Sequence, residues 1–102
     1  MKYEIIDSAG RTILHVSGDM TASDRGEFDA LLPRLFHSGG GLVIDMKGLE
    51  YMDSAGLGML LLLHKKAQEK GAGVAIRNPE GEVRKILELA RFDILFAIEY
   101  GG

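Results

Sequence analysis

The sequence contains no cysteine among its 102 residues. A disulfide, a zinc–thiolate site and a thiol nucleophile are therefore all excluded. The chain also lacks a basic block, because its lysines and arginines occur singly or in pairs and the formal net charge is −3. Nucleic-acid binding needs a clustered basic footprint, so we expect no direct contact with nucleic acid.

Long apolar runs are absent as well. The run Met59 to Leu63, which no other apolar run exceeds in length, is far shorter than the roughly 20 residues that a membrane-spanning helix needs. The first residues, Met1-Lys2-Tyr3-Glu4, do not resemble a signal peptide. We therefore expect a cytoplasmic protein without membrane insertion. A composition that is 46% hydrophobic and 26% charged suits one compact domain spanning residues 1–102.

Apolar periodicity in the first half predicts two strands and a helix. Alternation over residues 3–7 and 12–17, with a short turn between them, predicts an antiparallel hairpin. The segment Gly18 to Thr21 should break the second strand, and Thr21 or Ser23 can cap a following helix. Apolar residues spaced by three, four and seven continue that helix, which Pro33 should kink.

The second half predicts a strand covered on both faces, or nearly so, at residues 42–46, because this segment is almost continuously apolar. A loop over 47–51 then leads to a second helix over about 55–70, which Gly71-Ala72-Gly73 should end. A short strand at 74–76 follows.

Asn78-Pro79 should start the third helix, with Asn78 as its cap and Pro79 as its first residue. A last strand should lie within residues 92–98. Because helices alternate with strands after the hairpin, we expect an α/β fold. It should contain a mixed β-sheet, formed by an N-terminal hairpin and then β-α units, with about three helices packed on it.

The segment Met52 to Gly58 joins the central strand to the second helix. Helix N-termini expose unpaired N–H groups and the positive end of the dipole, so a phosphate on Ser54 would lie in a favourable field. Capping alone also explains the serine, and local physics favours the cap over a regulated serine, although the two roles are compatible. Asp53 fits a cap or a loop-bracing acceptor. A serine-hydrolase motif, Gly-x-Ser-x-Gly, is absent.

Two glycines and a group of leucines follow Ser54. Gly56 and Gly58 each cost about 1 kcal/mol relative to alanine in a helix interior. Tight packing on the sheet and a bare surface for a partner explain them equally well. The apolar side chains either bury the helix broadly or form a docking patch, with Leu57, Leu60 and Leu61 on one face and Met59, Leu62 and Leu63 partly elsewhere.

The remaining polar residues indicate no metal or cofactor. His15, His37 and His64 are scattered, without an acid or a second histidine at ligand spacing. Acids near the first helix suit a solvated face. Strand C-termini and helix N-termini gather at one edge of such a sheet, so the 18–24 loop can lie near Ser54.

At these residues the chain resembles the STAS family, in particular the bacterial anti-anti-sigma factors, which are anti-sigma factor antagonists. The most specific part is residues 42–58, Leu-Val-Ile-Asp-Met-Lys-Gly-Leu-Glu-Tyr-Met-Asp-Ser-Ala-Gly-Leu-Gly. The Gly18-Asp19-Met20-Thr21 segment and Asn78-Pro79 add support, and the similarity covers nearly the whole chain. Relatives often carry an acid where Thr21 stands, and a final helix for which this sequence leaves no room.

The resemblance implies a phospho-switched binding module rather than an enzyme. Ser54 would be phosphorylated by a serine-protein kinase that is also an anti-sigma factor. The unphosphorylated form would sequester that partner, and a metal-dependent serine phosphatase would reset the switch. The free protein is expected to be a monomer. The implied partner-binding residues are Asp19, Thr21, Asp53, Ser54, Ala55, Gly56, Leu57, Gly58 and Met59.

Two other functions stay open at this point. A constitutive STAS adaptor or scaffold subunit, held in a larger regulatory or transport complex, would need no phosphate on Ser54. An enzyme that uses Ser54 as a nucleophile, or a nucleotide hydrolase, fits the residues less well, because no catalytic partner or phosphate-binding loop accompanies the serine.

Overall fold

The structure is a computed structural model that describes residues 1–36 and 40–100. Its strands are β1 (Lys2–Ser8), β2 (Arg11–Met20), β3 (Leu42–Met52), β4 (Val74–Arg77) and β5 (Ala97–Glu99). Its helices are α1 (Arg25–Leu31), α2 (Ser54–Lys70) and α3 (Gly81–Leu89), with 3-10 turns η1 (Ala22–Asp24), η2 (Leu32–Leu35) and η3 (Phe92–Ile94). The predicted α/β class is confirmed.

The strands form one mixed sheet in the order β1-β2-β3-β4-β5. The first pair is antiparallel and the other three pairs are parallel. Ala9 and Gly10 join the first pair with φ values of 51° and 80°. Positive φ at both central positions is typical of a type I′ turn, whose twist matches that of the paired strands, so the predicted hairpin is confirmed together with its physical cause.

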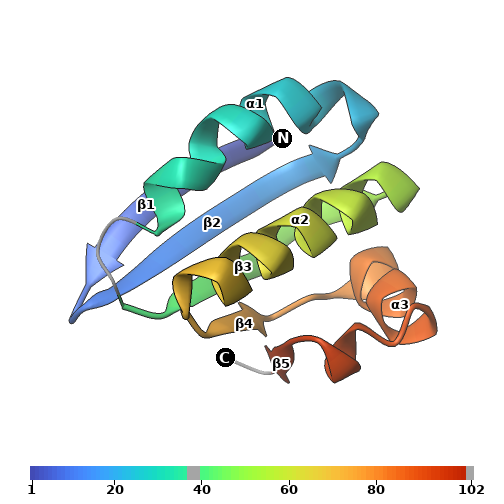
Figure 1. Cartoon of the computed structure of the whole chain (residues 1–102). Helices are drawn as coiled ribbons and strands as arrows, with labels where there is room; N and C mark the ends of the chain where they lie inside the picture. Colours follow the sequence, from blue (N-terminus) through green and yellow to red (C-terminus); the bar gives the residue numbers. More distant parts are fainter. Residues whose placement is uncertain (37–39, 101–102) are drawn as a thin grey trace.

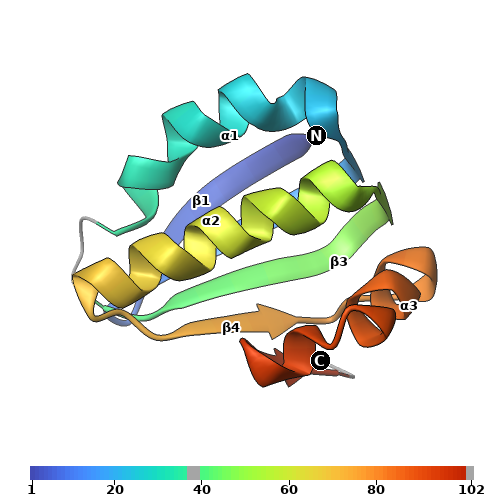
Figure 2. The same cartoon turned by 45° about the vertical axis from the view of Figure 1, so that its right-hand side comes forward.

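The helices cover one face of this sheet. Each parallel crossover moves to the next strand in the same direction, so right-handed crossovers place every helix on the same side. Figures 1 and 2 show α1 and α2 lying over that face. Leu42, Ile44 and Met46 of β3 join the buried cluster beneath the helices. Val43 is also buried, but it points to the other face. Helices cover only one face of β3, but Val43 on the other face is 2% exposed and Asp45 is half-buried, so the prediction that residues 42–46 are covered on both faces, or nearly so, is confirmed.

Both central strands are longer than the sequence pattern predicts. β2 continues through the expected break to Met20, and β3 runs through the expected loop to Met52. Their register shifts between His15 and Ser17, and again between Gly18 and Asp19. These bulges, with Gly18 at φ 80°, let the strand continue after a residue that would otherwise end it.

The helix ends show where local signals succeed and fail. Gly71 ends α2 in the left-handed conformation at φ 68°, as predicted. Pro33 does more than kink the first helix, because the chain changes from α1 to the 3-10 turn η2 at Leu32. Asn78 does not cap α3. It adopts φ 57° after β4, its N–H donates to the Glu99 carbonyl at 2.7 Å, and the cap position belongs to Glu80.

Candidate functional site

Asp53 caps the N-terminus of α2. Its backbone is extended, and its Oδ1 accepts hydrogen bonds from the N–H groups of Ala55 at 2.9 Å and Gly56 at 3.1 Å. The carboxylate thereby satisfies two of the donors that a helix leaves unpaired. The cap role expected for Asp53 is confirmed, and the cap role favoured for Ser54 was wrong, because the preceding carboxylate already occupies those amides.

Ser54 is consequently the first helical residue, with an exposed side chain. Among the residues that the structure describes, none forms a hydrogen bond with its hydroxyl group. A phosphate here would face the positive end of a 17-residue helix. It would also lie in the same turn as the Asp53 carboxylate, so the added charge could not be neutralised within that turn.

The end of β2 lies beside Ser54, as expected from the topology. Met20 is the parallel partner of Met52, and the Asp53 N–H donates to the Met20 carbonyl at 3.4 Å. Asp19 and Tyr51 are paired in the same register, and both are exposed. Tyr51, with 48% of its surface exposed, is a residue at this edge that the sequence analysis did not select.

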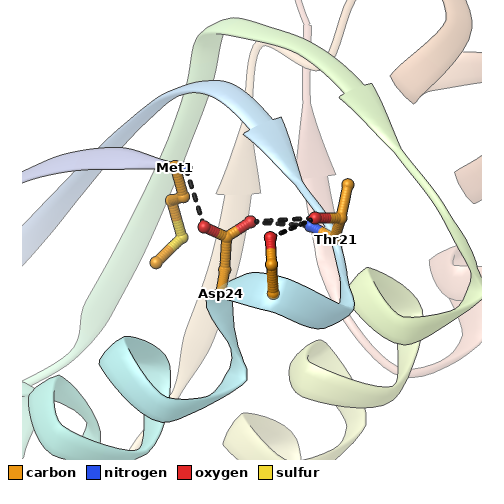
Figure 3. Close-up of polar contacts among 4 residues, drawn as sticks. Met1, Thr21 and Asp24 are labelled. Carbon is orange, nitrogen blue, oxygen red and sulfur yellow. Dashed lines mark hydrogen bonds and ion pairs between the residues drawn. The ribbon is translucent and has the colours of Figure 1, made fainter.

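Thr21 and Asp24 brace the loop that follows β2 (Figure 3). The Thr21 N–H donates to Asp24 Oδ2 at 2.8 Å, and the Met1 α-amino group donates to Asp24 Oδ1 at 2.8 Å. These two donors, the amino group first, hold the pKa of Asp24 below its usual value, although burial opposes them. The Thr21 hydroxyl lies 3.0 Å from Ser23 Oγ. Thr21 is thus placed near Ser54 by a braced turn.

The two glycines after Ser54 have different environments. A Cβ on Gly56 would lie 2.8 Å from the Met20 carbonyl oxygen and would also collide with Met52 Cγ. Only glycine lets the first turn of α2 pack this closely on β2 and β3. A Cβ on Gly58 would meet no atom within 4 Å. The fold therefore does not require Gly58. Tight packing explains Gly56, and a bare surface for a partner stays a prediction for Gly58.

The leucines of α2 divide differently from the expected pattern. Gly56, Met59, Leu60, Leu63 and Ala67 are buried. Met59 is only 1% exposed and Gly56 is also buried, so the structure does not place these two predicted partner-binding residues on the surface. Leu57 and Gly58 are half-buried and Leu61 is 46% exposed.

Ser54, Leu57, Gly58 and Leu61 follow one another at helical spacing and form the outer stripe of α2. Leu61 was not among the residues predicted to bind a partner. Its spacing of seven from Ser54 is the signal that could have identified it.

Within residues 1–36 and 40–100, no group of three metal-binding side chains converges. His37 lies outside the described residues. No helix in that part of the chain has the length and apolar character needed to cross a membrane. A shallow hollow of about 560 Å³ lies over Lys2, His15, Ser17, Asp45 and Gly48, on the sheet face away from α2, and so it is separate from Ser54.

The comparisons with known proteins identify the fold family. A family model described as "Mlab, STAS domain" matches residues 6–97. The chain belongs to the STAS domain family. A STAS-domain containing protein of Pseudomonas aeruginosa (strain UCBPP-PA14) is 40% identical over 75 residues, which are 74% of this chain and 68% of that protein. An anti-sigma F factor antagonist of Paenibacillus polymyxa is 33% identical over 49 residues, 48% of this chain and 42% of that protein.

Solved structures show the same STAS architecture. The crystal structure of an anti-sigma factor antagonist from Mycobacterium paratuberculosis matches with a TM-score of 0.78 and 25% identity, covering 99% of this chain and 86% of that one. The murine anion transporter Slc26a9 matches with a TM-score of 0.71 and 17% identity, covering 86% of this chain and 15% of the transporter. The second similarity shows the fold alone. The fold thus occurs both in a small antagonist and in part of a transporter.

Proposed function

We propose that this STAS domain is a cytoplasmic anti-sigma factor antagonist that acts by partner switching and catalyses no reaction. Its unphosphorylated form sequesters a serine-protein kinase that is also an anti-sigma factor. Phosphorylation of Ser54 by that kinase ends the complex, and a metal-dependent serine phosphatase restores it. One observation carries the proposal: Asp53 caps α2 and leaves the adjacent Ser54 hydroxyl exposed, without a hydrogen-bond partner among residues 1–36 and 40–100.

The surroundings of Ser54 support a contact surface. The outer stripe of α2 starts at Ser54 and continues through apolar residues to Leu61. Asp19, Thr21 and Tyr51 lie at the adjoining ends of β2 and β3. A surface that combines apolar, aromatic and polar groups in this way is typical of protein–protein interfaces.

Phosphorylation would change this surface strongly. A phosphoserine adds a charge of about −1.5 to −2. In the free protein the helix dipole and water stabilise that charge. In the complex the same charge would lie against the apolar stripe and beside Asp53, where desolvation and repulsion both oppose binding. The modification therefore weakens the complex more than it weakens the fold.

The test is a binding assay with wild-type, Ser54→Ala and Ser54→Asp proteins as bait in lysate of the source cells, followed by titration of the purified kinase. The hydroxyl makes no bond that alanine would lose, so Ser54→Ala should bind like the wild type. Ser54→Asp should bind more weakly by about 2 kcal/mol or more, roughly thirtyfold, the usual cost of an unpaired charge in an interface.

Ser8→Asp is the matched control, because Ser8 is exposed at the opposite edge of the sheet. It should bind normally. Equal affinity of the kinase for Ser54→Ala and Ser54→Asp would contradict the switch. Mass spectrometry of the purified protein after incubation with the kinase and ATP should find phosphate on Ser54 alone.

A constitutive adaptor in a regulatory or transport complex is the second candidate. The observation that raises it is the occurrence of the same fold within a transporter structure. In that case all three baits should retain the same partners, and no phosphate should be found on Ser54 in cells in any growth state. The same pull-down therefore separates the two functions.

A further inference from the structure

The sheet face opposite the helices carries two continuous rows of side chains. The strand register places one residue of each strand in a charged row, which consists of Glu4, His15, Asp45, Arg77 and Glu99. Two residues along each strand, the same register gives an apolar row, which consists of Ile6, Ile13, Val43, Ala75 and Ala97. Side chains that are paired in register point to the same face, so each row crosses all five strands.

Acids and bases alternate along the charged row. The acids stand on β1, β3 and β5, and the two basic side chains stand on β2 and β4. His15 Nδ1 lies 3.4 Å from Asp45 Oδ2, and Arg77 Nε lies 3.7 Å from Glu99 Oε1. The His15 side chain is still 43% exposed and that of Arg77 26% exposed. These groups can therefore bind further charges from a partner.

The alternating row is complementary to a reversed copy of itself. We propose that this face binds a second copy of the chain about a two-fold axis that runs parallel to the strands, between β2 and β3. Such an axis reverses the strand order and leaves each row opposite the same row. It places Glu4 opposite Arg77 and His15 opposite Asp45, in both directions. Each facing pair then joins an acid to a base.

The apolar row is complementary under the same operation. Its bulky residues are on β1 to β3, and its alanines are on β4 and β5. Reversal places Ile6 opposite Ala75, whereas Val43, which is 2% exposed in the free chain, lies beneath the facing Ile13 and adds little contact. Large side chains therefore face smaller ones, which is the arrangement that lets two packed surfaces interdigitate. Ile6 is 37% exposed, so the dimer would cover apolar surface that is open to water in the free chain.

The geometry of packed sheets allows these contacts. Strands lie about 4.8 Å apart, so the Glu4–Arg77 pairs lie roughly 7 Å from the axis. An angle of about 30° between two aligned sheets shifts such a pair by roughly 4 Å, which long side chains can span. β2 and β3 can face each other over about seven residues, and β1 and β4 over the four residues of β4, which gives a contact of about 350 Å² on each subunit, at the small end for protein interfaces. The dimer should therefore be weak, and the expected monomer should prevail in dilute solution.

The test is analytical ultracentrifugation of the 102-residue chain from about 10 μM to 1 mM, the range in which small interfaces associate. The wild type should shift from monomer to dimer. Arg77→Glu and, separately, Glu4→Arg should each raise the dissociation constant at least about tenfold, because each places like charges opposite one another twice. The double variant should restore the dimer. Glu69→Arg, on the exposed side of α2, is the control and should leave association unchanged.

Each outcome decides the proposal. Circular dichroism first establishes that the variants are folded. If Arg77→Glu does not fold, Glu4→Arg still tests the proposal, because Glu4 is exposed on an edge strand and its replacement should not disturb the fold. Recovery of the dimer in the charge-swapped double variant supports the two-fold arrangement. A wild type that stays monomeric at the highest concentration overturns it. A dimer whose dissociation constant is unchanged by both Arg77→Glu and Glu4→Arg also overturns it, since such a dimer must use another surface.

Discussion

Gly56 and Gly58 lie two residues apart on α2, and alanine at each should have opposite effects. Gly58→Ala should stabilise the fold by up to about 1 kcal/mol, the usual difference between the two residues in a helix interior. In a domain of this size that corresponds to a rise in Tm of roughly 4 to 8 °C. Gly56→Ala gains the same helix propensity, but its Cβ would lie 2.8 Å from the Met20 carbonyl oxygen. Overpacking costs about 1 to 3 kcal/mol, so the net result should be a loss of up to about 2 kcal/mol.

The binding assay then tests whether the absence of a side chain at Gly58 is needed for partner binding. If the partner approaches the outer stripe of α2 closely, Gly58→Ala should weaken kinase binding while it raises Tm. Gly26→Ala is the control, because Gly26 is an exposed helix residue on α1 with no atom within 4 Å of its added Cβ. It should raise Tm without changing affinity. Shifts of Tm in the same direction for Gly56→Ala and Gly58→Ala would refute the packing argument. Unchanged affinity of Gly58→Ala would refute the close approach.

Three further predictions concern the surroundings of Ser54. Asp53→Ala removes both capping hydrogen bonds and should cost about 1 to 2 kcal/mol in urea unfolding, whereas Asp53→Asn should retain most of that stability. Because the pKa of Asp24 is lowered on folding, its contribution to the free energy of unfolding is complete above the unfolded pKa of about 3.9 and is lost as the pH falls through the folded pKa. Asp24→Asn should therefore flatten the dependence of the unfolding free energy on pH in that range. Identical pH dependence in the variant and the wild type would contradict the ion pair. Met59→Ala, at a side chain 1% exposed, should lower the free energy of unfolding by about 2 to 5 kcal/mol. Leu61→Ala should change it by less than about 0.5 kcal/mol and should weaken partner binding instead. Equal destabilisation by the two variants would show that the faces of α2 are misassigned.

The sequence predicts the features that depend on residues close together in the chain. Positive φ at Ala9 and Gly10 makes a hairpin turn, and Gly71 ends α2 in a left-handed conformation, each through a local backbone preference. Local patterns also identified residues 52–58 as the connection between a strand and a helix. The topology expected from those patterns predicted that the end of β2 lies beside this connection. Strand alternation with helices was enough for the α/β class, because parallel strands require such crossovers.

Packing instead decided which of several neighbouring residues caps a helix or is buried, because their local preferences are similar. Asp53 and Ser54 are both good caps, and the way β3 delivers the chain to α2 decided that Asp53 takes the amides and Ser54 stays free. The periodicity of α2 could not tell Met59 from Leu61, because almost every residue there is apolar; contact with the sheet buries one and exposes the other. Asn78 lost its expected cap position because β5 fixes its N–H.

The sequence by itself therefore determined the order of the elements and the location of Ser54 at the connection between β3 and α2, since turns, caps and helical periods act over a few residues. The tertiary structure alone decided which side chains meet across the sheet. Two bulges set how far β2 and β3 run before they reach α2. The strand register, antiparallel between β1 and β2 and parallel between the other strands, aligned five residues from separate segments into one alternating charged row. A shift of one residue in a strand would send its side chain to the opposite face, and no local pattern specifies that register across all five strands.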